Sequence, residues 1–177
     1  NLDNKSQTDN LSYAFEHGKT LIDLAKLSRK VRDYSESEDL TIRAIQKFEL
    51  AKKNDYLPLS YHNLGTVAKY LGRYDDAVSY HLKSIDYAKG IGKEDIYAVS
   101  GYNNIGTVYK ARGQYEKAKE YYNKGLSYEE YLSQNPVKKT RLLDNLAYVL
   151  FLENSNDSRL PKLFFNSLKI REDINDL

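Results

Sequence analysis

Three asparagines that recur every 41 residues are the clearest candidates for binding chemistry in this sequence. They are Asn63, Asn104 and Asn145, and each directly precedes a leucine or an isoleucine. A side-chain amide can both donate a hydrogen bond to a peptide unit and accept one from it, so an evenly spaced row suits an extended backbone. The alternative is that these asparagines cap or bridge neighbouring helices of the protein itself. The spacing favours a row that grips a peptide and leaves this alternative open.

A second recurring position is basic. Lys69 and Lys110 each follow an asparagine of the row by six residues, Arg29 holds the corresponding place nearer the N-terminus, and Phe151 breaks the row. Such a stripe attracts an acidic peptide or a C-terminal carboxylate, with an attraction that weakens as salt rises. The arginine would hold a carboxylate through two hydrogen bonds, whereas the lysines would act as point charges. The alternative is a set of solvated helix ends, where basic residues suit the helix dipole.

Five further side chains lie beside these rows and would provide selectivity for a ligand's side chains. They are Thr66, Thr107, Tyr148, His62 and Asn103. Around Tyr148 the sequence turns apolar, with Phe151 and Leu152, which would suit a hydrophobic anchor. The interpretation we favour is that a further repeat covers these apolar residues, because a solenoid normally closes with a polar capping helix.

Paired helices must position these residues, because the sequence repeats itself with a helical pattern. Residues 61–83 match residues 102–124 at 11 of 23 positions without a gap. In each copy apolar and small residues follow the i, i+3, i+4, i+7 spacing of an amphipathic helix, and a second stripe begins after Gly72 or Gly113. A fixed period of this length indicates a stack of helical hairpins. The asparagines and lysines then fall on the first helix of each hairpin.

Weaker copies flank these two and extend the repeat over most of the chain. We expect one domain at residues 11–177 behind a flexible lead-in at residues 1–10. Its repeats are predicted at residues 18–57, 58–98, 99–139 and 140–177. Each of the three prolines, Pro58, Pro136 and Pro161, falls at or near a predicted helix start, where the missing N–H costs nothing. Asn135 is the predicted N-cap of the helix that begins at Pro136.

The repeat resembles the tetratricopeptide repeat, with its large residue, Leu-Gly pair, turn and spaced alanines. Gly65 and Gly106 stand where the first helix meets the second, and Ala77 and Ala118 stand at the counterpart position; His81 departs from the pattern by replacing an aromatic residue. The resemblance implies an all-α, right-handed superhelical solenoid of about four antiparallel helix hairpins. It also implies that the first helices line a concave groove, where the asparagine and basic rows would face a ligand.

Composition and motifs argue against several other classes of protein. A net charge of +2 is too small for a nucleic-acid reader, and no apolar run is long enough for a membrane span. With no cysteine and three scattered histidines, the sequence contains no metal signature. No catalytic or phosphate-loop motif occurs. We therefore expect neither an enzyme nor a cofactor.

The predicted function is recognition of a protein or peptide, with an acidic segment as the favoured ligand. The repeat is also similar to the sensor regions of bacterial signalling regulators, which implies the sensory or adaptor part of a larger signalling protein. That resemblance favours an extracytoplasmic, periplasmic location, with a cytoplasmic one as the alternative. The competing function is a structural scaffold that self-associates, with its groove filled by its own neighbouring repeats and a homo-oligomer formed through the apolar C-terminal face.

Overall fold

The computed structural model describes the backbone of residues 2–175 and the side chains of residues 9–174. Within that range the regular structure is helical and no strand occurs, so the predicted all-α fold is confirmed. The chain divides into two compact units, residues 1–97 and residues 98–177, and the boundary lies inside one helix. No helix in the described range is both long and apolar enough to cross a bilayer.

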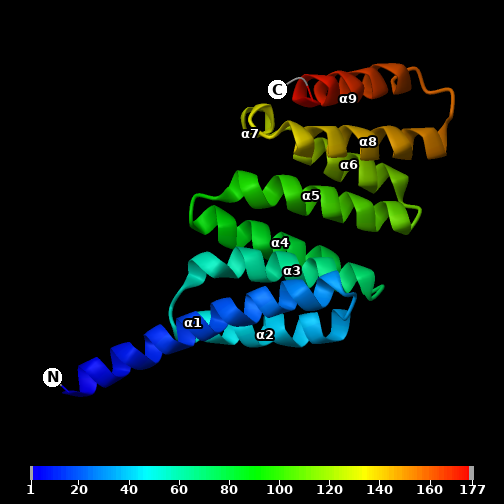
Figure 1. Ribbon diagram of the computed structural model, residues 1–177. Helices are drawn as coiled ribbons and strands as arrows, with labels where there is room; N and C mark the ends of the chain where they lie inside the picture. The colour runs from blue at the N-terminus through cyan, green and yellow to red at the C-terminus, as the bar shows by residue number, and fades with distance from the viewer. Residues whose placement is uncertain (1, 176–177) are drawn as a thin grey trace. The chain divides into compact units, whose positions relative to one another are not determined.

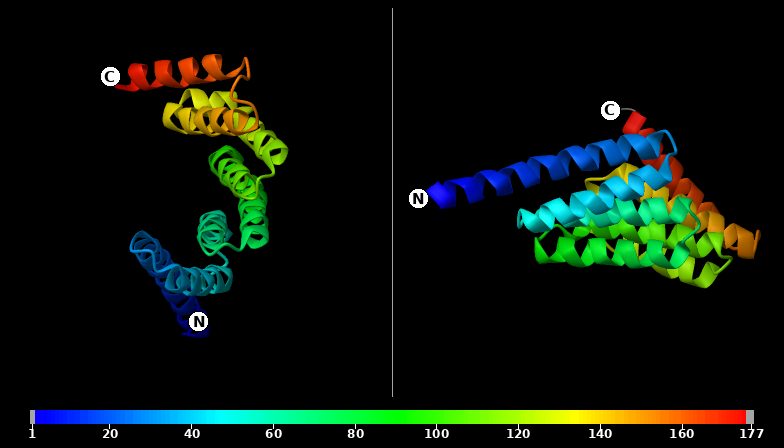
Figure 2. Two further views of the ribbon diagram at one scale, coloured as in Figure 1. Left: turned by 90° about the vertical axis from the view of Figure 1, so that its right-hand side faces the viewer. Right: turned by 90° about the horizontal axis from the view of Figure 1, so that it is seen from below.

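The first unit contains two antiparallel helical hairpins (Figure 1). Its elements are α1 (Leu2–Lys30), α2 (Tyr34–Leu50), the 3-10 helix η1 (Asn54–Tyr56), α3 (Leu57–Tyr70) and α4 (Tyr74–Gly90). Buried apolar side chains such as Leu21, Phe48 and Leu64 join α1, α2 and α3 into one core. The expected lead-in is helical from Leu2 onward, and Figure 2 shows this part of α1 extending past the end of α2.

The second unit contains the other two hairpins. Its elements are α5 (Glu94–Ala111), whose first residues belong to the first unit, α6 (Tyr115–Leu126), the short α7 (Glu129–Ser133), α8 (Pro136–Glu153) and α9 (Leu160–Asn175). Their core surrounds Tyr122, with Ala118, Leu142 and Leu150 packed beside it. The third repeat was expected from residue 99 and the fourth from residue 140, whereas α5 and α8 begin a few residues earlier.

The first helices of the first three hairpins end in the same left-handed turn, whereas α8 ends at Asn154 in an extended conformation. Gly72 has φ +74° and Gly113 has φ +70°, which places the two predicted breaks where they were expected. The first hairpin puts Arg32 at this position, with φ +65°. In all three turns the residue that follows the left-handed one donates its backbone N–H to a carbonyl in the last turn of the helix, as in the 2.8 Å bond from Asp33 N to Ser28 O. A side chain with a Cβ is disfavoured in this conformation, so Arg32 is the unusual member of the set.

The prolines begin helices as predicted. Pro58 lies in the first turn of α3, Pro136 is the first residue of α8, and Pro161 is the second residue of α9. Asn135 occupies the N-cap position of α8, but its side chain does not cap the helix. Its amide instead donates a 2.9 Å hydrogen bond to Tyr131 O, back towards α7.

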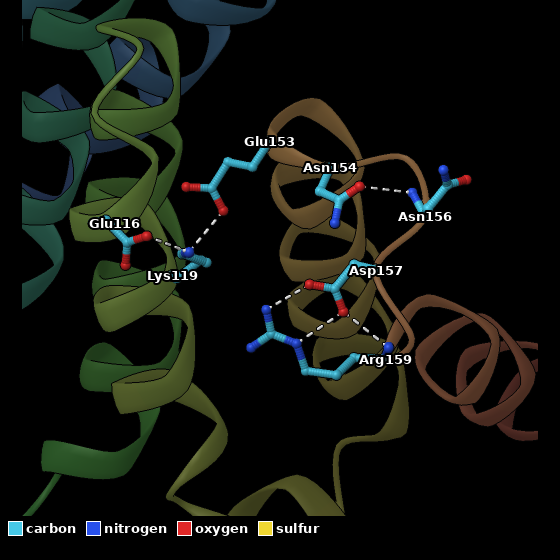
Figure 3. Close-up of polar contacts among 7 residues, drawn as sticks. All are labelled: Glu116, Lys119, Glu153, Asn154, Asn156, Asp157 and Arg159. Carbon is cyan, nitrogen blue, oxygen red and sulfur yellow. Dashed lines mark hydrogen bonds and ion pairs between the residues drawn. The ribbon is translucent and has the colours of Figure 1, made fainter.

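Polar contacts fix the loop between α8 and α9 (Figure 3). Asp157 accepts hydrogen bonds from the backbone N and the guanidinium of Arg159, and these bonds lower the pKa of Asp157 to about 2. At the end of α8, Glu153 pairs with Lys119 of α6 at 2.6 Å. These contacts lie in the loop that precedes α9 and at the end of α8.

The repeated glycines allow the first helix of a hairpin to pack directly against a ring on the second. A Cβ added to Gly106 would lie 2.5 Å from Tyr122 Cε1, and one added to Gly65 would lie 2.8 Å from the His81 ring. Real Cβ atoms do not approach that closely. Both rings are fully buried. His81, at which the sequence departs from the family pattern, therefore occupies a core position on the second helix of its hairpin.

Candidate functional site

Four of the predicted binding residues gather in the second unit, and we name them the amide–lysine patch. Asn145 Nδ2 on α8 donates a 2.9 Å hydrogen bond to Asn103 Oδ1 on α5, and Lys110 Nζ lies 3.4 Å from Asn145 Oδ1. The same ammonium group lies 4.9 Å from the ring centroid of Tyr148. Asn145 therefore connects two neighbouring first helices, which is the bridging role that the sequence left open, and it also positions Lys110.

An apolar hollow adjoins this patch, with a volume of about 610 Å³. Its lining consists of Asp144, Asn145, Tyr148, Phe151, Phe164 and Arg171. Phe151 and Phe164 are each 50% exposed, so their faces are available to a ligand. Asp144 accepts a 2.6 Å hydrogen bond from Ser167 Oγ and pairs with Arg171, which ties α8 to α9 beside the hollow.

The electrostatics of the patch centre on Lys110. Its side chain is half-buried, and this burial lowers the pKa of its ammonium group. Among the described residues no carboxylate pairs with it, and its polar contact is the neutral amide of Asn145. A partly desolvated cation without a counter-ion favours the approach of an anion, because an opposite charge stabilises the ammonium group that burial has removed from water.

A second candidate site lies in the first unit, and we name it the basic pocket. It has a volume of about 610 Å³ and is lined by Arg29, Lys30, Arg32, Tyr34, Thr66 and Tyr70. The rings of Tyr34 and Tyr70 stack with centroids 4.9 Å apart and planes 6° from parallel. Two predicted binding residues, Arg29 and Thr66, thus share a cavity at the ends of α1 and α3.

The other predicted residues are placed less favourably for binding. Asn63 is 4% exposed, so its amide is withdrawn from the surface and belongs to neither site. The Thr66 and Thr107 hydroxyls donate back to His62 O and Asn103 O of their own helices. The remaining three are half-buried: His62 beside the ring of His81, Lys69 with Nζ 5.0 Å from the Tyr70 ring centroid, and Asn104 on α5.

Several lining residues were not anticipated. In the basic pocket these are Lys30, Arg32, Tyr34 and Tyr70, and in the apolar hollow they are Phe164 and Arg171. For Arg32 a signal was present, because it occupies the repeat position held by Gly72 and Gly113. Phe164 gave no such signal, since its place depends on the loop that sets the start of α9.

The described residues contain no group of three or more metal-ligating side chains close enough to hold an ion. The two sites present hydrogen-bonding amides, unpaired cations and exposed rings.

Comparisons with known proteins agree with this architecture. The family model described as tetratricopeptide repeat matches residues 56–128. Among solved structures, the crystal structure of BtubC (BKLC) from P. vanneervenii superimposes with a TM-score of 0.74, covering 96% of this chain and 74% of that one. The two sequences are 20% identical, so this likeness establishes the fold. No curated protein sequence matches. Residues 56–128 are therefore assigned to the tetratricopeptide repeat, and the structural likeness extends a helical-repeat fold over nearly all of the chain.

Proposed function

We propose that this protein is an interaction module that binds an extended segment of a partner protein along the first helices of its repeats. Tetratricopeptide repeats generally mediate protein–protein interaction and are typically not catalytic. The observation that carries the finer proposal is Lys110, a half-buried cation that Asn145 positions beside the apolar hollow. Its desolvation is a cost to folding that a bound anion would remove.

The geometry of the amide–lysine patch indicates the kind of segment that it would bind. A ligand carboxylate would pair with Lys110, while the remaining N–H groups of Asn103 and Asn145 would donate to peptide carbonyls. An apolar side chain next to the carboxylate would enter the hollow between Phe151 and Phe164. The favoured ligand is therefore an acidic residue flanked by an aromatic or aliphatic one. The sensory or adaptor role in a signalling protein that the resemblance implies is part of this proposal.

Panning a random peptide library against the full chain tests the proposal. We expect the selected peptides to share a carboxylate next to an apolar residue. Lys110→Met should weaken their binding about tenfold in calorimetry, because one charge-assisted hydrogen bond is lost. Lys117→Met is the matched control. Lys117 Nζ also lies over a tyrosine ring, 5.3 Å from the ring centroid of Tyr109, but Lys117 belongs to α6, the second helix of its hairpin. Equal binding by the two variants would exclude the patch as the binding surface.

A second function, self-association, is favoured by an exposed apolar cluster on α9. Phe164, Phe165 and Leu168 are 50%, 66% and 53% exposed and lie within about one helical turn. Clusters of this kind mark interaction surfaces more often than single exposed apolar residues do. Two copies of the chain would bury them against each other.

Sedimentation equilibrium distinguishes this alternative from the first proposal. If the α9 cluster joins two copies, Phe165→Ser should shift the protein towards monomer. Val31→Ser, which changes a 77% exposed apolar residue in the first unit, should leave the equilibrium unchanged. A wild-type chain that sediments as a monomer at all concentrations would eliminate self-association.

A further inference from the structure

We propose that the basic pocket of the first unit binds a phosphate monoester carried by a partner protein. The pocket consists of the six residues Arg29, Lys30, Arg32, Tyr34, Thr66 and Tyr70. The inference rests on the proposed function in one respect, namely that the anion belongs to a protein. The pocket itself is separate from the amide–lysine patch and is tested without it.

The first argument is the number of cations in the pocket that lack a counter-ion. Among the described residues, Arg29, Lys30 and Arg32 form no ion pair and no side-chain hydrogen bond. Cations close by in the structure are paired: Lys26 lies 2.9 Å from Asp23, and Arg73 pairs with Glu38. Three unpaired cations within four residues of the chain make a site of concentrated positive charge.

The carboxylate on the same turn forms no ion pair with these cations. Asp33 follows Arg32, but its Oδ1 accepts a 3.0 Å hydrogen bond from Glu36 N and caps α2. The last carbonyls of α1 are likewise occupied, with Arg32 N bonded to Arg29 O and Asp33 N to Ser28 O. The polar groups left for a ligand are therefore mainly the two guanidinium groups, the ammonium group and the tyrosine hydroxyls.

The charge and shape of the ligand follow from these groups. A phosphate monoester carries a charge of about −1.5 to −2 at pH 7 and has three strong acceptor oxygens. A single carboxylate would leave most of the pocket's positive charge unbalanced. Guanidinium groups match phosphate oxygens through paired hydrogen bonds, and the lysine adds a point charge. The volume of about 610 Å³ and the stacked rings of Tyr34 and Tyr70 leave room for the side chain that carries the phosphate.

The backbone at Arg32 gives an independent argument. Its φ of +65° is a conformation that the second and third hairpins reserve for Gly72 and Gly113. A residue held in this conformation at the edge of a cavity is the kind of outlier that accompanies function. Lys52, with φ +55°, is in the same conformation but does not line the basic pocket. The two residues therefore form a matched pair in which the backbone is alike and the location differs.

The experiment is a titration of the ¹⁵N-labelled full chain with N-acetyl-phosphoserine amide, followed by the amide and arginine side-chain resonances. We expect saturable chemical-shift changes at Arg29, Arg32 and Thr66. The affinity for N-acetyl-glutamate amide should be at least tenfold lower. Arg32→Gly should raise the melting temperature, because it relieves the left-handed strain, and should lower phosphoserine affinity about tenfold. Lys52→Gly should raise the melting temperature similarly and leave the affinity unchanged.

Three results would overturn the inference: no saturable shift at the pocket, equal affinity for the glutamate and phosphoserine compounds, or equal loss of affinity in Arg32→Gly and Lys52→Gly. Because both variants are expected to be at least as stable as the wild type, misfolding does not confuse the outcome. A negative result here leaves the Lys110 peptide test unaffected, so the failures of the two proposals are distinguishable.

Discussion

Replacing Gly106 with valine is expected to lower the free energy of unfolding by about 3 kcal/mol, the upper end of the usual cost of overpacking a core. The Cβ alone would lie 2.5 Å from Tyr122 Cε1 and 2.7 Å from Cδ1. The ring cannot move outward, because it is fully buried among the core residues of the second unit. The substitution must therefore push α5 and α6 apart.

Urea denaturation of the full chain measures this effect, with Gly90→Val as the control. A Cβ at Gly90 meets nothing within 4 Å, so the same change there should alter stability by only about 0.5 kcal/mol through helix propensity. Adding Tyr122→Leu to Gly106→Val should cost less than the sum of the two single changes, since the smaller side chain makes room for valine. Strict additivity, or equal losses at Gly90 and Gly106, would show that the ring contact is not what requires glycine.

This contact also shows why much of the fold could be predicted from the sequence. Gly65 and Gly106 lie 41 residues apart, and each is followed by a turn glycine and an alanine. This repeated pattern predicts a close approach of two helices in both hairpins. The prolines mark helix starts because their missing N–H is tolerated there. The sequence does not predict the short α7, which lies between two hairpins, and it predicts a flexible lead-in where α1 is helical, because neither stretch carries the repeated pattern.

The binding surface was less predictable, because period and spacing give the face of a helix but not what packs against that face. Asn63 and Asn145 hold the same repeat position, yet the first is 4% exposed and the second reaches across to Asn103. The exposure of each depends on neighbours that differ between the repeats. In the basic row, Arg29 and Lys110 lack carboxylate partners among the described residues, and the sequence could not show this because ion pairing depends on side chains from other helices.

Lowering the pH is expected to destabilise the protein through His81 in a way that the corresponding ring of the third hairpin, Tyr122, does not share. Burial, followed by the nearby His62 and Lys69, lowers the pKa of His81 well below its usual 6.5. The folded state therefore keeps this imidazole neutral at a pH where the unfolded chain binds a proton. Stability is fully present above pH 6.5 and is lost as the pH falls below it, by up to about 1.4 kcal/mol per pH unit.

Urea denaturation at pH 7.5 and pH 5 checks this expectation when wild type is compared with His81→Phe. The variant should fold, because Tyr122 shows that a six-membered ring fits opposite the glycine of the first helix. It should lose less stability than the wild type on acidification, since it has no imidazole to protonate on unfolding. If His81→Phe and wild type lose the same stability, the acid sensitivity arises from other groups and the buried imidazole carries none of it.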